Sequence, residues 1–205
     1  INVLKEELIP AMGCTEPIAL AYAAAVARKT LGEMPDKVVV EASGSIIKNV
    51  KSVIVPNTGH LKGINAAAAA GIVAGDPDKK LEVIATVSQE QIQQMKQFME
   101  EVPIQVVHME DGCTFDIIVT VFCGKSYAKV RIANFHTNIV LIEKNGEVLK
   151  SEAVSDDSEE GLTDRTLLDM EHIWDFAMTA DIDDVKALLD QQMAFNVAIA
   201  EEGIK

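Results

Sequence analysis

Aromatic side chains are scarce in this chain: Phe, Trp and Tyr together make up 4% of its 205 residues. Its core must therefore be built from Ala, Val, Ile, Leu and Met. Hydrophobic residues account for 48% and charged residues for 24%, proportions that are ordinary for a globular protein and exclude wholesale disorder. A chain of this length can form one large domain or two small ones.

Basic residues are also few, with 18 Lys and Arg against 32 Asp and Glu and a formal net charge of −14. Nucleic-acid binding needs clustered cations, so this balance excludes a nucleic acid as partner. The longest apolar run, residues 64–74, is about half of the roughly 20 residues that a membrane-spanning helix needs. We therefore expect no membrane partner, and no secretory signal pattern is visible.

Cysteine is sparse as well, and an odd count of three does not make a disulfide framework. This count favours a reducing compartment, so we expect a cytoplasmic protein. Because the sequence begins at Ile1 rather than Met, we treat it as a possible fragment, the N-terminal part of a longer protein.

Several helices are indicated by composition and by capping residues. Residues 2–10 predict a short helix that ends at Pro10. Residues 18–28 and 64–74 are dominated by Ala and predict two helices that are buried on several sides and pack against each other. Thr15 is the predicted N-cap of the first Ala-rich helix, Pro17 fits its first turn, and Gly75 is the predicted C-terminal glycine of the second.

Runs rich in Val and Ile predict strands at residues 37–43, 52–56 and 81–87. Ser88 and Gln91 match a capping box. One side of the amphipathic helix that follows carries Ile92, Met95, Met99 and Val102. Residues 104–150 show one strand pattern after another, and Asn145-Gly146 is a strong hairpin signal. The predicted fold class is α+β, with a mostly antiparallel sheet flanked by Ala-rich and amphipathic helices.

The predicted organisation is a helical segment at 1–36, an α/β sheet region at 37–150 and a second helical segment at 162–205. Residues 151–161 are acidic and polar, which predicts a solvated loop, and we assign no metal to it. The last helix is expected to begin at Asp181. The face that it would present to a partner carries Val185, Leu188, Leu189 and Met193.

Cys14 is the most informative single residue of the sequence. It stands just before a predicted helix start, where the helix dipole and unpaired backbone N–H groups favour the thiolate, the form that binds a metal or attacks an electrophile. The alternative is a small buried residue that fills a tight turn beside Gly13.

Four motifs in order carry a resemblance to a known family. They are Gly13-Cys14-Thr15-Glu16-Pro17 with the Ala-rich run after it, Lys48-Asn49, Val55-Pro56-Asn57-Thr58-Gly59 with Gly63 and the second Ala-rich run, and His136-Thr137-Asn138-Ile139-Val140. The chain thereby resembles the serine dehydratase alpha-chain superfamily, in its N-terminal half only. The nearest branch is that of the L-cysteine desulfidases and their uncharacterised relatives.

The resemblance implies a lyase that eliminates the β-substituent of a small L-amino acid. L-Cysteine would give pyruvate, ammonia and sulfide, and L-serine would give pyruvate and ammonia. In that family a cysteine like Cys14 is one of three ligands of a 4Fe–4S cluster. The open iron acts as a Lewis acid on the substrate while a base removes its α-proton. The other ligand cysteines belong to a C-terminal half that is absent here, so a missing C-terminal domain or subunit is the expected partner and this chain alone is expected to be inactive.

The same resemblance suggests residue roles. His136 and Lys48 are the two candidates for the base, and Lys48 equally suits pairing with the substrate carboxylate. The candidate substrate-binding residues are Thr15, Glu16, Asn49, Asn57, Thr58, Gly59, Thr137 and Asn138. For residues 57–59 the alternative is a simple turn, and for Glu16 it is a favourable charge in the first turn of a helix.

Several alternatives stay open at the level of sequence. Cys113 and Cys123 lie ten residues apart around an alternating strand, a poor spacing for completing a cluster site with Cys14. The chain could instead be a non-catalytic small-molecule-binding or regulatory module, or a subunit that docks onto another polypeptide. A homo-oligomer is also compatible with the sequence, and nothing in it selects between serine and cysteine as substrate.

Overall fold

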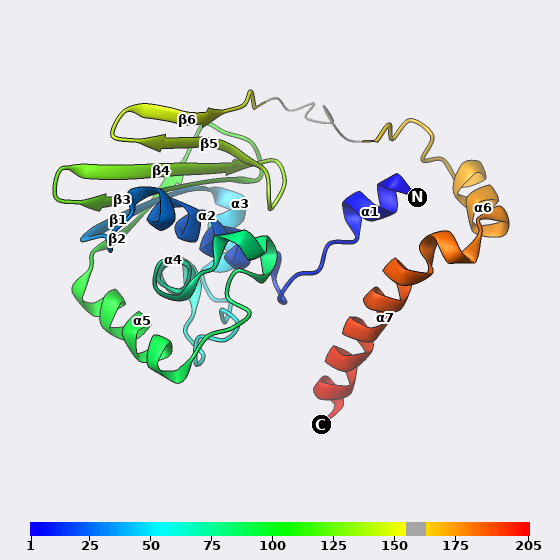
Figure 1. Ribbon diagram of the computed structural model, residues 1–205, viewed down its shortest axis with the longest axis horizontal. Coiled ribbons are helices and arrows are strands. Elements are labelled where there is room, and N and C mark those ends of the chain that lie inside the picture. Colours follow the sequence, from blue (N-terminus) through cyan, green and yellow to red (C-terminus); the bar gives the residue numbers. More distant parts are fainter. Residues whose placement is uncertain (155–162) are drawn as a thin grey trace. The chain divides into compact units, whose positions relative to one another are not determined.

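The computed structural model describes residues 1–154 and 163–205, which form two compact units. The larger unit spans Ala11–Asp156, and the smaller one combines Ile1–Pro10 with the described part of Asp157–Lys205. The division differs from the segments that the sequence suggested. Helix α1 (Asn2–Glu7) lies in the smaller unit, whereas α2 (Thr15–Leu31) packs within the larger one (Figure 1).

The larger unit is built on one six-stranded sheet in the order β2-β1-β3-β4-β5-β6. The strands are β1 (Lys37–Ser43), β2 (Ile104–Met109), β3 (Asp116–Cys123), β4 (Ser126–Ala133), β5 (Ile139–Lys144) and β6 (Glu147–Ser151). β1 pairs with β2 in parallel, and the other four neighbouring pairs are antiparallel. The predicted α+β class with a mostly antiparallel sheet is confirmed.

Alternation of side chains gives the sheet one buried face. On β1, Val38, Val40 and Ala42 are fully buried, whereas Val39 and Glu41 point to the other face and are half-buried. The same period of two places alternate apolar residues of β3 and β4 on the buried face. Helices α2 and α4 (Gly63–Ala74) lie against this face, and α3 (Gly44–Val50) and α5 (Gln89–Glu101) complete the helical layer (Figure 1).

The two Ala-rich helices, α2 and α4, pack against each other as predicted, and a glycine of α4 allows their backbones to approach closely. A Cβ atom on Gly71 of α4 would lie 2.0 Å from the carbonyl oxygen of Ala21 of α2, well inside van der Waals contact. Gly75 ends α4 where predicted, but its φ of −68° is not left-handed. A Cβ atom on Gly75 would lie 2.4 Å from the carbonyl oxygen of Gly71 in its own helix and 2.7 Å from the Cβ atom of Ala25 in α2. Gly71 therefore serves interhelical packing, whereas a side chain at Gly75 would clash with its own helix end as well as with α2.

Several local predictions are confirmed in detail. Ser88 and Gln91 form the complete capping box of α5. Asn145 and Gly146 make the two-residue turn between β5 and β6, both with positive φ, as a type I′ hairpin requires.

Two local predictions are wrong in detail. The N-cap of α2 is Cys14 rather than the predicted Thr15. On α5, Phe98 is buried where the sequence suggested Met99, which is half-buried.

Two predicted strands are wrong. In residues 52–56, Ile54 forms an isolated bridge with Lys62, because the chain reverses at once through a turn with left-handed Asn57, Gly59 and His60. Of residues 81–87, the first two end a 3₁₀ helix, η1 (Pro77–Glu82), and the next four form turns and bends. Val83 and Ile84 are adjacent and both buried, which a strand with one polar face does not allow.

The smaller unit holds α1, α6 (Met170–Thr179) and α7 (Ile182–Ile204). Asp181 caps α7 as predicted, accepting a hydrogen bond from the backbone of Asp183. Arg165 forms ion pairs with Glu6 at 2.8 Å and Glu7 at 2.9 Å, which fix α1 in this unit. Most of the predicted acidic loop at 151–161 lies outside the described residues. Among the described residues, no helix is both long and apolar enough to span a membrane.

Replacing Gly71 by Ala should destabilise the larger unit by about 3 kcal/mol, at the upper end of the usual cost of overpacking, because backbone atoms of α2 cannot yield as a flexible side chain would. Urea denaturation followed by circular dichroism measures the change. Asn65→Ala is the matched control: it lies exposed on the same helix and should be neutral or slightly stabilising. Equal stabilities for the Gly71 variant and the parent would contradict the close approach of α2 and α4.

Candidate active site

Most of the candidate site residues lie near one end of strands β1, β3 and β4; this end is called here the edge of the sheet. β1 ends there at Ser43, β3 begins there at Asp116, and β4 ends there at Ala133, because β3 runs antiparallel to both neighbours. Ser43 also caps α3, accepting a hydrogen bond from the backbone of Ile46. The edge therefore carries α3, the loop before β3 and the loop between β4 and β5.

His136 lies in the loop between β4 and β5 and is joined to the start of α2. The Oγ1 atom of Thr15 and the Nε2 atom of His136 are 2.8 Å apart, in a hydrogen bond between residues 121 positions apart in the sequence. The imidazole also packs against Phe115, with ring centroids 4.5 Å apart. Phe115 was not predicted as a site residue, since nothing in its local sequence indicates which loop it contacts.

The loop that carries His136 is short and internally bonded. The backbone N–H of Asn134 donates to the carbonyl of Phe115 at 2.9 Å, and that of Ala133 donates to the carbonyl of Asn138 at 3.1 Å. The Asn138 side-chain amide donates back to the Ala133 carbonyl at 3.0 Å. The predicted substrate residue Asn138 is thus used in shaping the loop, and the position of the imidazole is well determined.

Glu16 connects the remaining members of the site. Its carboxylate accepts hydrogen bonds from the Cys14 thiol at 3.1 Å and from the Asn49 side-chain amide at 3.2 Å. The Thr15 hydroxyl lies 3.5 Å from the same carboxylate. Cys14, Thr15, Glu16, Asn49 and His136 therefore form one contiguous hydrogen-bonded group, called here the Cys14 cluster.

Proton positions within the Cys14 cluster follow from burial and from these bonds. Partial burial, together with the hydrogen bond to Glu16 and its negative charge, raises the pKa of the Cys14 thiol. Burial also acts to raise the pKa of Glu16, but donation from Cys14, its own backbone and Asn49 outweighs it, so that pKa lies below its ordinary value. The proton resides on sulfur. The expected thiolate at the helix start is therefore not the resting form of Cys14, because an anionic neighbour opposes the dipole.

His136 is held neutral near pH 7. Burial lowers the pKa of its imidazole, and the nearby Glu16 carboxylate offsets this only in part. The hydrogen bond to Thr15 has two possible senses. Either the hydroxyl donates to Nε2, or a protonated Nε2 donates to the hydroxyl, which can then donate toward Glu16. A neutral imidazole in a fixed orientation is suited to accept a proton.

A buried ion pair supports the edge beneath this loop. Asp116, which is fully buried, binds Arg131 through two hydrogen bonds of 2.9 and 2.6 Å. Ser43 donates to the carbonyl of Thr114 at 2.7 Å, so the start of α3 and the loop of Phe115 are tied together. Sequence reasoning did not select these residues, since charged and polar positions on a strand are ordinarily solvated.

The predicted substrate loop at residues 57–59 has structural contacts. The Asn57 amide donates to the carbonyls of Ile84 and Ala85, at 3.0 and 3.1 Å, and the buried Thr58 hydroxyl donates to that of Val55 at 2.7 Å. Asn57 has a φ of 58°, a left-handed conformation that Asn and Gly adopt readily. These contacts fit a packed turn, and a role of Asn57, Thr58 and Gly59 in substrate binding stays a prediction.

Lys48 precedes Asn49 on α3 and is exposed, and among the described residues it forms no hydrogen bond or ion pair. Thr137 lies beside His136 and is half-buried, with no side-chain hydrogen bond to the Cys14 cluster. The structure thus joins five of the candidate residues, whereas Lys48 adjoins this group only through its sequence neighbour Asn49.

The described residues do not contain a complete metal site. No group of three or more His, Cys, Asp or Glu side chains among them is placed to hold a metal ion, and all three cysteines are free thiols. Cys113 donates to the carbonyl of Phe115 at 2.9 Å. Cys123 is the last residue of β3, at the opposite end of the strand from Asp116. At the usual rise per residue the two residues are about 20 Å apart. Cys14 is exposed, so its thiol is accessible at the start of α2.

Folding stability should depend on pH through His136. Since its folded pKa is depressed, the unfolded chain binds the proton more tightly, and stability falls as pH drops through the ordinary histidine value of about 6.5 toward the folded pKa. His136→Gln should remove this contribution, and urea denaturation at several pH values measures it. His108→Gln, at an exposed position on β2, is the control and should keep the parental slope. An unchanged slope in the His136 variant would contradict the burial of a neutral imidazole.

Comparison with known proteins gives relatives along the full chain. A UPF0597 protein of Desulfitobacterium hafniense is 55% identical over 205 residues, all of this chain and 48% of that protein. UPF0597 proteins of Treponema denticola and Lachnoclostridium phytofermentans are 41% and 43% identical, with 48% and 49% of their lengths covered. No family model and no solved structure matches the chain. The chain is therefore similar to UPF0597 proteins, a name that states no activity, and it spans about half the length of these curated relatives.

Proposed function

We propose that this chain forms part of the active site of an iron–sulfur-dependent lyase that eliminates the β-substituent of L-cysteine or L-serine. The observation that carries the proposal is the 2.8 Å contact between Thr15 and His136. It joins two of the motifs that resemble the serine dehydratase alpha-chain superfamily, and Asn49 of a third motif bonds to Glu16 beside them. Motifs that are distant in sequence and meet in one polar cluster support a shared role.

Cys14 is the residue that would bind the 4Fe–4S cluster. Its sulfur is exposed and lies at the start of a 17-residue helix, where the dipole favours an anionic ligand once the proton is displaced. When bound, the cluster would supply a Lewis acid for the departing thiol or hydroxyl of the substrate. Glu16 is suited to receive or relay the proton of Cys14, to which it is already hydrogen-bonded.

His136 is the preferred base for the α-proton. It is neutral near pH 7, and its ring is oriented by Thr15 and Phe115. After the α-proton leaves and the Cβ–S or Cβ–O bond breaks, the aminoacrylate product hydrolyses to pyruvate and ammonia. Lys48 is exposed and cationic, which suits the substrate carboxylate better than proton abstraction. The Asn49 amide can assist in binding that carboxylate.

The rest of the proposed enzyme lies outside this chain. The remaining cluster ligands would come from a further domain or subunit, which is consistent with relatives about twice as long. The three free thiols fit the reducing cytoplasm, where we place the reaction.

Cys14→Ser should abolish pyruvate and sulfide release in the longest natural polypeptide that contains this sequence, after anaerobic reconstitution with iron and sulfide. A serine hydroxyl is a much poorer ligand for iron than a thiolate. The assay measures pyruvate, ammonia and sulfide from L-cysteine and L-serine, together with the visible absorbance of the cluster. Cys113→Ser and Cys123→Ser are the matched controls and should retain both cluster and activity.

Two results would overturn the proposal. One is full activity of the Cys14 variant with an intact cluster. The other is the absence of cluster absorbance and pyruvate from a folded parent protein under all reconstitution conditions, which would favour a non-catalytic binding module.

Kinetics should separate the roles of His136 and Lys48. His136→Asn is expected to lower kcat by about 10²- to 10⁴-fold with little change in KM, as for loss of a general base. Lys48→Met should raise KM by about tenfold or more and leave kcat largely unchanged, as for loss of a substrate contact. The reverse pattern would assign the base to Lys48.

A further inference from the structure

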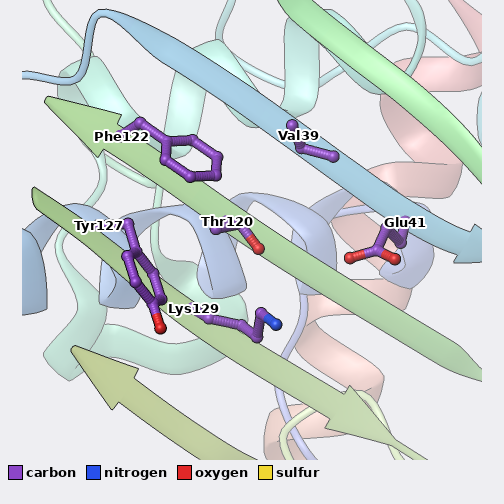
Figure 2. Close-up of a pocket in the computed structure, with 6 residues that line it drawn as sticks. All are labelled: Val39, Glu41, Thr120, Phe122, Tyr127 and Lys129. Carbon is purple, nitrogen blue, oxygen red and sulfur yellow. The ribbon is translucent and has the colours of Figure 1, made fainter. Parts of the chain in front are cut away.

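The outward face of the sheet holds a hollow that is unrelated to the Cys14 cluster. The helices of the larger unit lie on the other face (Figure 1). The hollow has a volume of about 290 Å³ and crosses three adjacent strands, β1, β3 and β4. The six residues that line it are Val39, Glu41, Thr120, Phe122, Tyr127 and Lys129 (Figure 2). Its volume suits a small organic molecule, at the lower end of ordinary ligand pockets.

Two charged groups of opposite sign, Glu41 and Lys129, lie half-buried in the hollow. Among the described residues, neither of them has a hydrogen-bond or ion-pair partner. Lys129 lies directly opposite Glu143 in the β4–β5 register, a position where opposite charges normally pair. Glu143 instead accepts a hydrogen bond from the Tyr127 hydroxyl. One anion and one cation are therefore left facing the same hollow.

Thr120 provides a third polar group. It is 5% exposed, and its hydroxyl has no hydrogen-bond partner among the described residues. No side-chain nitrogen or oxygen that is fully buried within the described residues lacks a partner, so this hydroxyl must open into the hollow. Figure 2 shows Thr120 between the two charged groups and the two rings. A nearly buried hydroxyl in this position is normally satisfied by a ligand or by water.

The other end of the hollow is lined by aromatic rings. Phe122 and Tyr127 form one wall, with ring centroids 6.0 Å apart, and Val39 lies across from Tyr127 (Figure 2). Lys37 places its ammonium group 5.3 Å from the centre of the Phe122 ring, which helps to hold this ring in place. The hollow thus combines an anion, a cation and a hydroxyl at one end with aromatic surface at the other.

We propose that this hollow binds a free α-amino acid with an apolar side chain. Glu41 would bind the ammonium group, Lys129 and the Thr120 hydroxyl would bind the carboxylate, and the side chain would lie against Phe122 and Tyr127. A zwitterion satisfies both charges at once, whereas a simple anion or cation leaves one of them unpaired. The site lies on the opposite face of the sheet from the helices and does not depend on the proposed lyase function.

Isothermal titration calorimetry of this chain with L-leucine and L-phenylalanine tests the site. Both should bind with one site per chain, whereas N-acetyl-L-leucine and L-leucinamide, each lacking one charge of the zwitterion, should bind at least tenfold more weakly. Glu41→Gln and Lys129→Met should each weaken L-leucine binding at least tenfold. Phe122→Ala should reduce the affinity for L-leucine toward that for glycine.

Two controls establish that a loss of binding arises in the hollow itself. Glu90→Gln, on the exposed side of α5, should bind as the parent does, and circular dichroism should show that every variant is folded. Absence of binding at millimolar L-leucine and L-phenylalanine would overturn the proposal, as would equal binding by the Glu41 and Lys129 variants. Sedimentation showing a parental dimer that these variants lose would also overturn it, because the face would then be an interface between copies of the chain.

Discussion

The contact between α2 and α4 is the constraint on which the larger unit depends. A backbone oxygen of one helix occupies the space where a side chain at Gly71 would begin, so the two helices form a thin layer of alanine and glycine. The 17-residue α2 lies against β3 and β4, and α4 packs mainly on α2 and α5. The start of α2 is thereby brought to the edge of the sheet where β3 begins and β4 ends, which makes a cluster around Cys14 possible.

The Cys14 cluster combines rigid support with incomplete chemistry. The Asp116–Arg131 pair and the bonded loop of His136 hold the imidazole in place, and Glu16 accepts from both Cys14 and Asn49. Among the described residues, no group of three or more His, Cys, Asp or Glu side chains is placed to hold a metal ion, and Cys14 is an exposed free thiol. Under the proposed lyase function, the further ligands would come from another domain or subunit.

The two faces of the sheet differ in how their polar groups are satisfied. The inner face is apolar and closed by helices, whereas the outer face carries several charged and polar groups, some of which bond to each other, as Tyr127 does to Glu143. Within the described part of the chain, Glu41, Lys129 and Thr120 lie together without such partners. Because half-buried charges are costly to leave unpaired, their grouping in one hollow is more informative than the presence of any one of them.

Sequence by itself determined the features that rest on interactions between near neighbours. The strand at residues 37–43, the capping box at Ser88, the turn at Asn145-Gly146 and the Asp181 cap all appear as predicted. It failed at residues 81–87, where adjacent Val83 and Ile84 are both buried by tertiary packing. Family resemblance selected Cys14 and His136, but only the tertiary structure decided that Thr15 bonds His136 and that Phe115 packs on it. The bond from Thr15 joins segments more than 100 residues apart, and no local propensity encodes either contact: the folded core alone determines which loops meet.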